Sequence, residues 1–179
     1  MSDSCNFLQG VCTLQSLLDG YLTSGDFELD GLKEQIAEVG GIKFIPYDAQ
    51  PDETAKVLVT MRRGDIILSP QNNMGSDINT VAYRPSLTVV IKISTQSYRL
   101  TEKLGQEILQ FLAIMSAEIK KANLTIGGLQ LSPTANLPDS SPNYFACTIT
   151  ASCGIPLTMW KIANSSDILT SVKINTTFN

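Results

Sequence analysis

The sequence predicts an α+β fold, in which a mainly antiparallel (mixed) sheet packs on one long amphipathic helix, with helices at the N-terminus and a polar arm at the C-terminus. Three observations lead to this prediction. In residues 86–94 every second position is apolar, with Val90 as the one exception, which is typical of a strand with one buried face. Directly afterwards, apolar residues recur every three or four positions over about five turns, which predicts a long helix. The remaining strand-like segments are neighbours joined by turns and irregular loops, which favours antiparallel pairing.

Two helices are expected before the sheet. Residues 5–22 carry an amphipathic stripe that continues as far as Tyr21. A second, shorter helix is predicted to begin with Asp30 as its N-cap and to continue to Val39, where Gly40 and the following glycine end it.

The next segments are predicted to form strands. Residues 42–47 are a short apolar strand and residues 56–61 are a second one. The sequence Arg-Arg-Gly-Asp at 62–65 then predicts a turn into residues 66–68, so that a hairpin forms. Residues 71–80 are polar and are expected to be an exposed loop.

The long helix is predicted over residues 99–122. Ser97 is a suitable N-cap, and Asn123 can adopt the left-handed conformation at the C-terminal end. Lys103 and Glu107 lie four residues apart and are predicted to occupy the solvent-facing side of this helix.

Strands are expected to close the fold after the long helix. Residues 124–131 predict a strand with a bulge or bend at the two glycines at 127 and 128, and residues 132–143 predict a Pro- and Ser-rich loop. Residues 144–160 form a strand that Gly154 and Pro156 bend. We therefore expect a single domain over residues 1–162 and a polar arm over residues 163–179, in which Ile168 and Val172 are among the few apolar residues.

Composition narrows the class of protein. A chain of 179 residues with 43% apolar residues can bury the core of one domain. The net charge is −4 with only 13 Lys and Arg, and no basic run exceeds two residues, so a general nucleic-acid binder is not expected. The sequence has neither an apolar run long enough for a membrane span nor an N-terminal secretion signal. A soluble protein made in a cytoplasm, without a membrane partner, is the expectation.

No catalytic or metal-binding signature is found. The chain has no histidine, which excludes histidine-dependent nucleophiles and histidine metal ligands, and its four cysteines lack the spacing of zinc or redox sites, so buried thiols are expected. The acidic pairs Asp26 with Glu28 and Asp52 with Glu53 are interpreted as loop and helix-start residues. We expect no enzymatic activity, no cofactor and no metal.

The order of these elements resembles the tail terminator (tail-completion, neck) proteins of tailed bacteriophages. The shared features are an N-terminal helix, strands that end in one like 86–94, a long helix like 99–122, and closing strands like 144–162. The resemblance covers roughly residues 5–162 and depends on the arrangement of elements. It implies a structural virion protein, assembled in the host cytoplasm.

The resemblance also implies partners. The chain would form a homo-oligomeric ring, hexameric in this family, that caps the tail tube and meets the head connector, with a sheath protein as a further candidate partner. DNA would pass through the ring without specific binding. Candidate contact segments are the turn at 62–65, the loop at 71–80 and the arm at 164–179, while Trp160 is either an interface anchor or a core or rim residue. The candidate interface residues are Arg62, Arg63, Asp65, Asn72, Asn73, Asp77, Trp160, Ile168 and Val172.

Two other interpretations stay open. One is another virion part of similar architecture, such as a connector or a tail-tube-like subunit. The second is a cytoplasmic α+β domain that binds a small molecule or is an enzyme, which would need a pocket lined by convergent polar groups.

Overall fold

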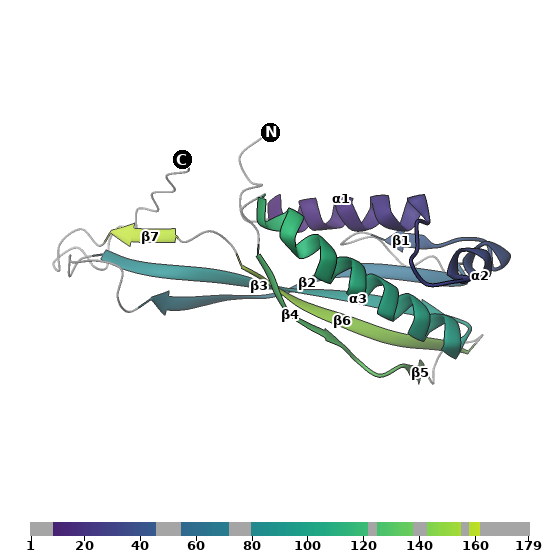
Figure 1. The fold of residues 1–179 in the computed structure, drawn as a ribbon. Coiled ribbons are helices and arrows are strands. Elements are labelled where there is room, and N and C mark those ends of the chain that lie inside the picture. The colour runs from purple at the N-terminus through teal and green to yellow at the C-terminus, as the bar shows by residue number, and fades with distance from the viewer. Residues whose placement is uncertain are drawn as a thin grey trace.

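The computed structural model of the chain describes residues 9–45, 55–71, 80–121, 125–137, 143–154 and 158–161. These residues form one sheet with helices on one side of it (Figure 1). The helices are α1 (Gln9–Ser24), α2 (Leu32–Glu38) and α3 (Tyr98–Lys121). The strands are β1 (Lys43–Ile45), β2 (Val57–Gln71), β3 (Thr80–Thr95), β4 (Thr125–Leu131), β5 (Ala135–Leu137), β6 (Tyr144–Gly154) and β7 (Thr158–Lys161).

The sheet is mixed and mainly antiparallel. Its seven strands follow the order β1-β2-β3-β6-β4, while β5 pairs with β6 and β7 pairs with β3. Only the pairing of β1 with β2 is parallel. The predicted α+β class, with a long helix packed on the sheet and helices at the N-terminus, is confirmed. Residues 163–179, the predicted arm, lie outside the described residues.

The core lies between β3 and α3. The alternating residues of β3 that the sequence singled out are all buried, and α3 buries its own stripe above β3, β6 and β4. From α1, Leu14 and Leu18 complete this cluster, as α1 lies on the same side of the sheet as α3 (Figure 1). The buried apolar residues of β3 and α3 are Leu87, Val89, Ile91, Ile93, Leu100, Leu104, Ile108 and Leu112.

The predicted hairpin turn at 62–65 is wrong. β2 continues through these residues as one strand paired with β3, and the register shifts only between Arg63 and Ile66, which is a bulge. Gly64 does not have a positive φ, so it does not serve a turn. A Cβ at Gly64 would lie 3.1 Å from the Cβ of Thr88, which shows that glycine is present because the two strands approach closely there.

Beyond this bulge the two long strands leave the helix layer. Residues 66–71 of β2 pair with β3 up to Gln71 opposite Ala82, and β7 pairs with residues 80–83 of β3. We call residues 66–71, 80–85 and β7 the ribbon. Figure 1 shows it projecting past the ends of α1 and α3. Residues 72–79, most of the predicted loop, lie outside the described residues.

Smaller differences concern the ends of elements. Asp30 does not cap α2, because the N-cap is Gly31 with φ 71° and no side chain caps this helix. Ser97 does cap α3, since its hydroxyl accepts a hydrogen bond from the backbone N–H of Leu100 at 3.4 Å. The bulge at residues 127–130 is confirmed, with Gly128 at φ 58°. Part of the predicted loop at 132–143 forms β5 instead, and Asn123 lies outside the described residues.

Glu107 is the clearest correction in the long helix. It was expected to face solvent, but its side chain is only 1% exposed. One carboxylate oxygen accepts hydrogen bonds from the hydroxyl of Tyr21 and from the backbone N–H of Glu28 (2.8 Å), and the other oxygen accepts one from the N–H of Leu29 (3.0 Å). A single carboxylate on α3 therefore holds both α1 and the loop at 25–31.

Tyr21 is packed tightly around this contact. Its ring stacks on Phe111 with centroids 3.9 Å apart and meets Phe27 edge to face at 5.6 Å. Burial, the hydrogen bond to Glu107 and nearby carboxylates raise the pKa of Tyr21 well above its ordinary value. The folded state thus favours the protonated phenol, and this contribution to stability is present below about pH 10 and is lost as the pH rises further.

Replacing Glu107 by glutamine should destabilise the fold by about 2–3 kcal/mol, because an amide NH₂ would face backbone N–H donors and leave buried groups unsatisfied. Tyr21→Phe should cost only about 1 kcal/mol, since it removes one hydrogen bond and keeps the ring stacking. Urea denaturation at pH 7 measures the free energy of unfolding of both variants. The neighbouring exposed Gln106→Glu is the matched control, expected within about 0.5 kcal/mol of the wild type. A Glu107→Gln variant as stable as this control would contradict the described anchoring.

Two helical glycines should respond oppositely to alanine. A Cβ at Gly105 would lie 2.8 Å from the sulfur of Cys147 and 3.2 Å from Leu131, so Gly105→Ala should destabilise by about 1–3 kcal/mol despite the better helix propensity. Nothing lies within 4 Å of a Cβ at Gly20, so Gly20→Ala should stabilise by about 0.5–1 kcal/mol. Thermal and urea unfolding measure the change in the free energy of unfolding for each variant. Changes of the same sign in the two variants would refute the close packing of α3 on β6.

Candidate assembly interface

Exposed apolar side chains gather at the base of the ribbon. Ile66 is 42% exposed and Ile67 is 54% exposed. They are consecutive in β2, so their side chains point to opposite faces of the strand pair. The only other large apolar side chains that are exposed in the described part of the chain are Tyr98 and Ile114, both on α3. Apolar residues on both faces of a ribbon that none of the described helices covers are typical of a surface that a partner covers.

The structure places the predicted contact residues in two groups. Arg62, Arg63 and Asp65 are exposed and lie at the bulge, next to Ile66. Trp160 lies in β7 opposite Val81, at the far part of the ribbon. Arg62 pairs with Val90 of β3, so positions 90 and 81 separate the two groups by about 30 Å along the strand. They cannot form one contact point. The other candidates, Asn72, Asn73, Asp77, Ile168 and Val172, lie outside the described residues.

The sheet has an open face on the side away from the helices. On this face the pairing of β2, β3 and β6 sets their side chains in rows across the three strands. One row is Thr60, Lys92 and Thr148, and the next is Arg62, Val90 and Thr150. Arg62 and Lys92 are exposed, and the threonines are half-buried. None of the described side chains that register places on this face is a carboxylate. The open face is therefore polar and locally cationic.

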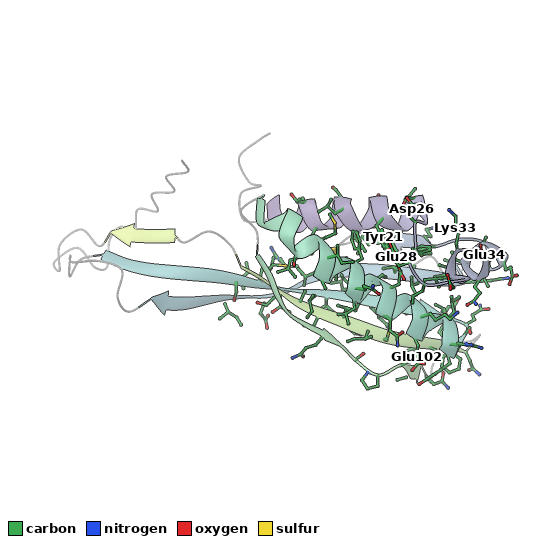
Figure 2. All side chains as sticks on the ribbon, in the orientation of Figure 1. Tyr21, Asp26, Glu28, Lys33, Glu34 and Glu102 are labelled. Atoms are coloured by element: carbon green, nitrogen blue, oxygen red, sulfur yellow. The ribbon has the colours of Figure 1, made fainter. Side chains whose placement is uncertain are left out.

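Carboxylates gather at the opposite end of the molecule from the ribbon. They come from the loop at 25–31 and from α2, and all are exposed (Figure 2). Lys33 is the one cation in this stretch. We call this group the acidic end: Asp26, Glu28, Asp30, Glu34 and Glu38. Asp26 and Glu28 were interpreted as ordinary loop residues. The folded chain places them at the same end of the molecule as the carboxylates of α2. The second acidic pair, Asp52 and Glu53, lies outside the described residues.

Two of the thiols are shielded from solvent. Cys147 and Cys153 are buried on the helix side of β6, and burial raises the pKa of each thiol from 9.0 to about 11. The protonated thiols therefore contribute stability below about pH 9 that is lost as the pH rises through about 11. The expectation of four buried thiols is wrong at Cys12, which is exposed, and Cys5 lies outside the described residues.

Within the described ranges, no group of three or more acidic, cysteine or histidine side chains is arranged to hold a metal ion. The helices in this part of the chain are too short or too polar to cross a bilayer. No protein-family model and no curated protein matches the chain. The likeness to tail terminators thus stays a prediction.

The sequence interpretation missed Ile66 and Ile67 as surface residues. It took residues 66–68 as the second arm of a hairpin. A usable signal was present, because the apolar run at 66–68 breaks the alternation seen in the strands that do cover the core. On a strand, such a run places apolar side chains on both faces.

Alkylation of the native protein at pH 8 should separate the cysteines. Cys12 is expected to react readily. Cys147 and Cys153 should react at least about 100-fold more slowly than Cys12, since they become accessible only when the core opens. Peptide mass spectrometry after timed labelling reads each site, and labelling in urea provides the control for full reactivity. Rapid modification of Cys153 in the native state would contradict its burial.

Proposed function

We propose that the chain is a structural subunit that assembles with copies of itself into a ring, and that this ring is the tail terminator of a tailed bacteriophage. The observation that carries the self-assembly is the ribbon, which projects beyond the helix layer with Ile66 and Ile67 exposed at its base. The ring would end the tail tube and join it to the head connector, with a sheath protein as a further candidate partner.

The ribbon has the reach and the chemistry for a contact between subunits. Residues 66–71 extend about 20 Å past the bulge, which is enough to lie over a neighbouring subunit. Strands that no other layer covers bury little apolar surface, so contact with another surface would stabilise them. A contact between two different surfaces of identical subunits closes into a ring when the rotation between them closes.

The tail-terminator part of the proposal is supported by the order of elements. The structure has an N-terminal helix, long strands leading into a long helix, and closing strands, which is the arrangement that carries the resemblance. A terminator also needs no reaction site, since its work is done by contacts. The hexameric ring and the tube, sheath and connector partners come from the resemblance.

Ile66→Asp combined with Ile67→Asp should abolish assembly, because the contact would have to bury two carboxylates without partners. Size-exclusion chromatography with light scattering should give a discrete ring for the wild type and a monomer for this variant. Tyr98→Asp is the matched control: Tyr98 is 47% exposed and begins α3 just after Thr95, at the end of β3 opposite the ribbon, so this variant should leave the ring intact.

Circular dichroism and urea unfolding establish that each variant is folded, and Ile67→Ser serves as a milder version should the double variant unfold. Electron microscopy of the wild type separates a single ring from the tube that a tail-tube subunit would form. A wild-type chain that stays monomeric at tens of micromolar, or a double variant that still assembles, would contradict the proposal.

A further inference from the structure

We propose that the contact between subunits is head-to-tail and electrostatic, with the open face of one copy receiving the acidic end of the next. This inference rests on the proposed self-assembly and names the two surfaces that carry it. The partner is a second copy of this chain, chosen on the grounds of charge complementarity and of where the two surfaces lie on the molecule.

The open face supplies a compact set of donors. Arg62 lies opposite Val90, and Lys92 is two residues further along β3, so the two cations occupy diagonal positions about 7 Å apart. The half-buried hydroxyls of Thr60, Thr148 and Thr150 lie in the same two rows. Guanidinium, ammonium and hydroxyl groups all donate hydrogen bonds, so this surface suits carboxylates.

The acidic end supplies carboxylates in a fixed arrangement. Glu107 accepts hydrogen bonds from the backbone N–H groups of Glu28 and Leu29, which holds the loop that carries Asp26 and Glu28 against α3. Within α2, Glu34 and Glu38 are four residues apart and therefore share one side of the helix. A surface ordered before binding loses less entropy on association than a mobile one.

The position of the two surfaces favours a head-to-tail contact. The acidic end is at the end of the molecule away from the ribbon, whereas Arg62 lies at the ribbon's base on the face away from the helices (Figures 1 and 2). One copy cannot bring its own two surfaces together. Copies with a net charge of −4 repel one another on average, and separate cationic and anionic surfaces give them one favourable orientation.

The cationic surface is also continuous with the exposed apolar residues. Ile67 lies opposite Ser86, on the same face of the sheet as Arg62 and Val90, and Asp65 in the bulge between them is the nearest carboxylate along the strand. The ribbon and the open face therefore make one interface, with apolar contacts at the ribbon and charge pairs beside it. Such a division is common in protein interfaces, where charged groups set the orientation of partners.

A charge-reversal experiment tests the pairing directly. One variant carries Arg62→Glu with Lys92→Glu, and a second carries Glu34→Lys with Glu38→Lys. Each alone should raise the dissociation constant of the assembly by about tenfold or more, because like charges would then meet at every contact. An equimolar mixture of the two should assemble again, since each reversed surface finds its complement on the other variant. The mixed rings should alternate and contain equal numbers of both chains.

The conservative variant Arg62→Lys with Lys92→Arg is the control and should assemble as the wild type does. Raising the salt concentration from about 0.05 to about 0.5 M should weaken the wild-type assembly and should weaken it less in a variant with both cations removed, Arg62→Gln with Lys92→Gln. Analytical ultracentrifugation measures all of these, with circular dichroism as the test of folding.

The outcomes separate this inference from the proposed function. A wild-type ring that neither charge-reversal variant weakens would overturn the head-to-tail pairing and leave self-assembly through the ribbon standing. Two weakened variants whose mixture stays monomeric would also overturn the pairing, because complementarity would not have been restored. A wild-type monomer at tens of micromolar would refute both.

Discussion

The packing of α3 across β3 and β6 is the contact on which the rest of the structure depends. It buries the alternating face of β3, and it leaves the other face of the sheet without a helix. The described helices also leave the ribbon uncovered, because β3 is longer than α3. The 16 residues of β3 extend about 54 Å, whereas the 24 residues of α3 extend about 36 Å, and the difference is close to the length of the ribbon. The ribbon and the open face, two of the surfaces proposed for assembly, are thus those that the helix layer does not reach.

Patterns within one element predicted most of the fold. The alternation in β3 and the apolar stripe of α3 each report a buried face directly, and both were confirmed. The continuity of β2 could not be predicted in this way, since glycine and charged residues favour a turn unless a neighbouring strand approaches as closely as Thr88 approaches Gly64. The burial of Glu107 likewise depends on a loop 79 residues earlier in the chain. Its spacing, three residues after Leu104 and four before Phe111, puts it at the edge of the apolar stripe, which was the available signal.

The candidate interface was predicted in part. Arg62, Arg63 and Asp65 were predicted as contact residues because a turn was expected there, and all three are exposed although β2 continues through them with a bulge. The acidic end could not be foreseen, since only the folded chain brings the loop at 25–31 and α2 to one end and places the cations of β2 and β3 on another surface. The separation of these acidic and basic surfaces depends on how the chain folds, so no short sequence motif predicts it.

Hydrogen exchange at several protein concentrations tests the central claim most directly, which is that copies of this chain cover the ribbon of one another. The account predicts that the amides of residues 66–71 and 80–85 exchange at least about tenfold more slowly when the protein is concentrated enough to assemble. The amides in the middle of α3 should exchange at the same rate at every protein concentration. Exchange in the ribbon that is equally fast at every concentration would show that nothing covers it, and self-assembly through the ribbon would be refuted.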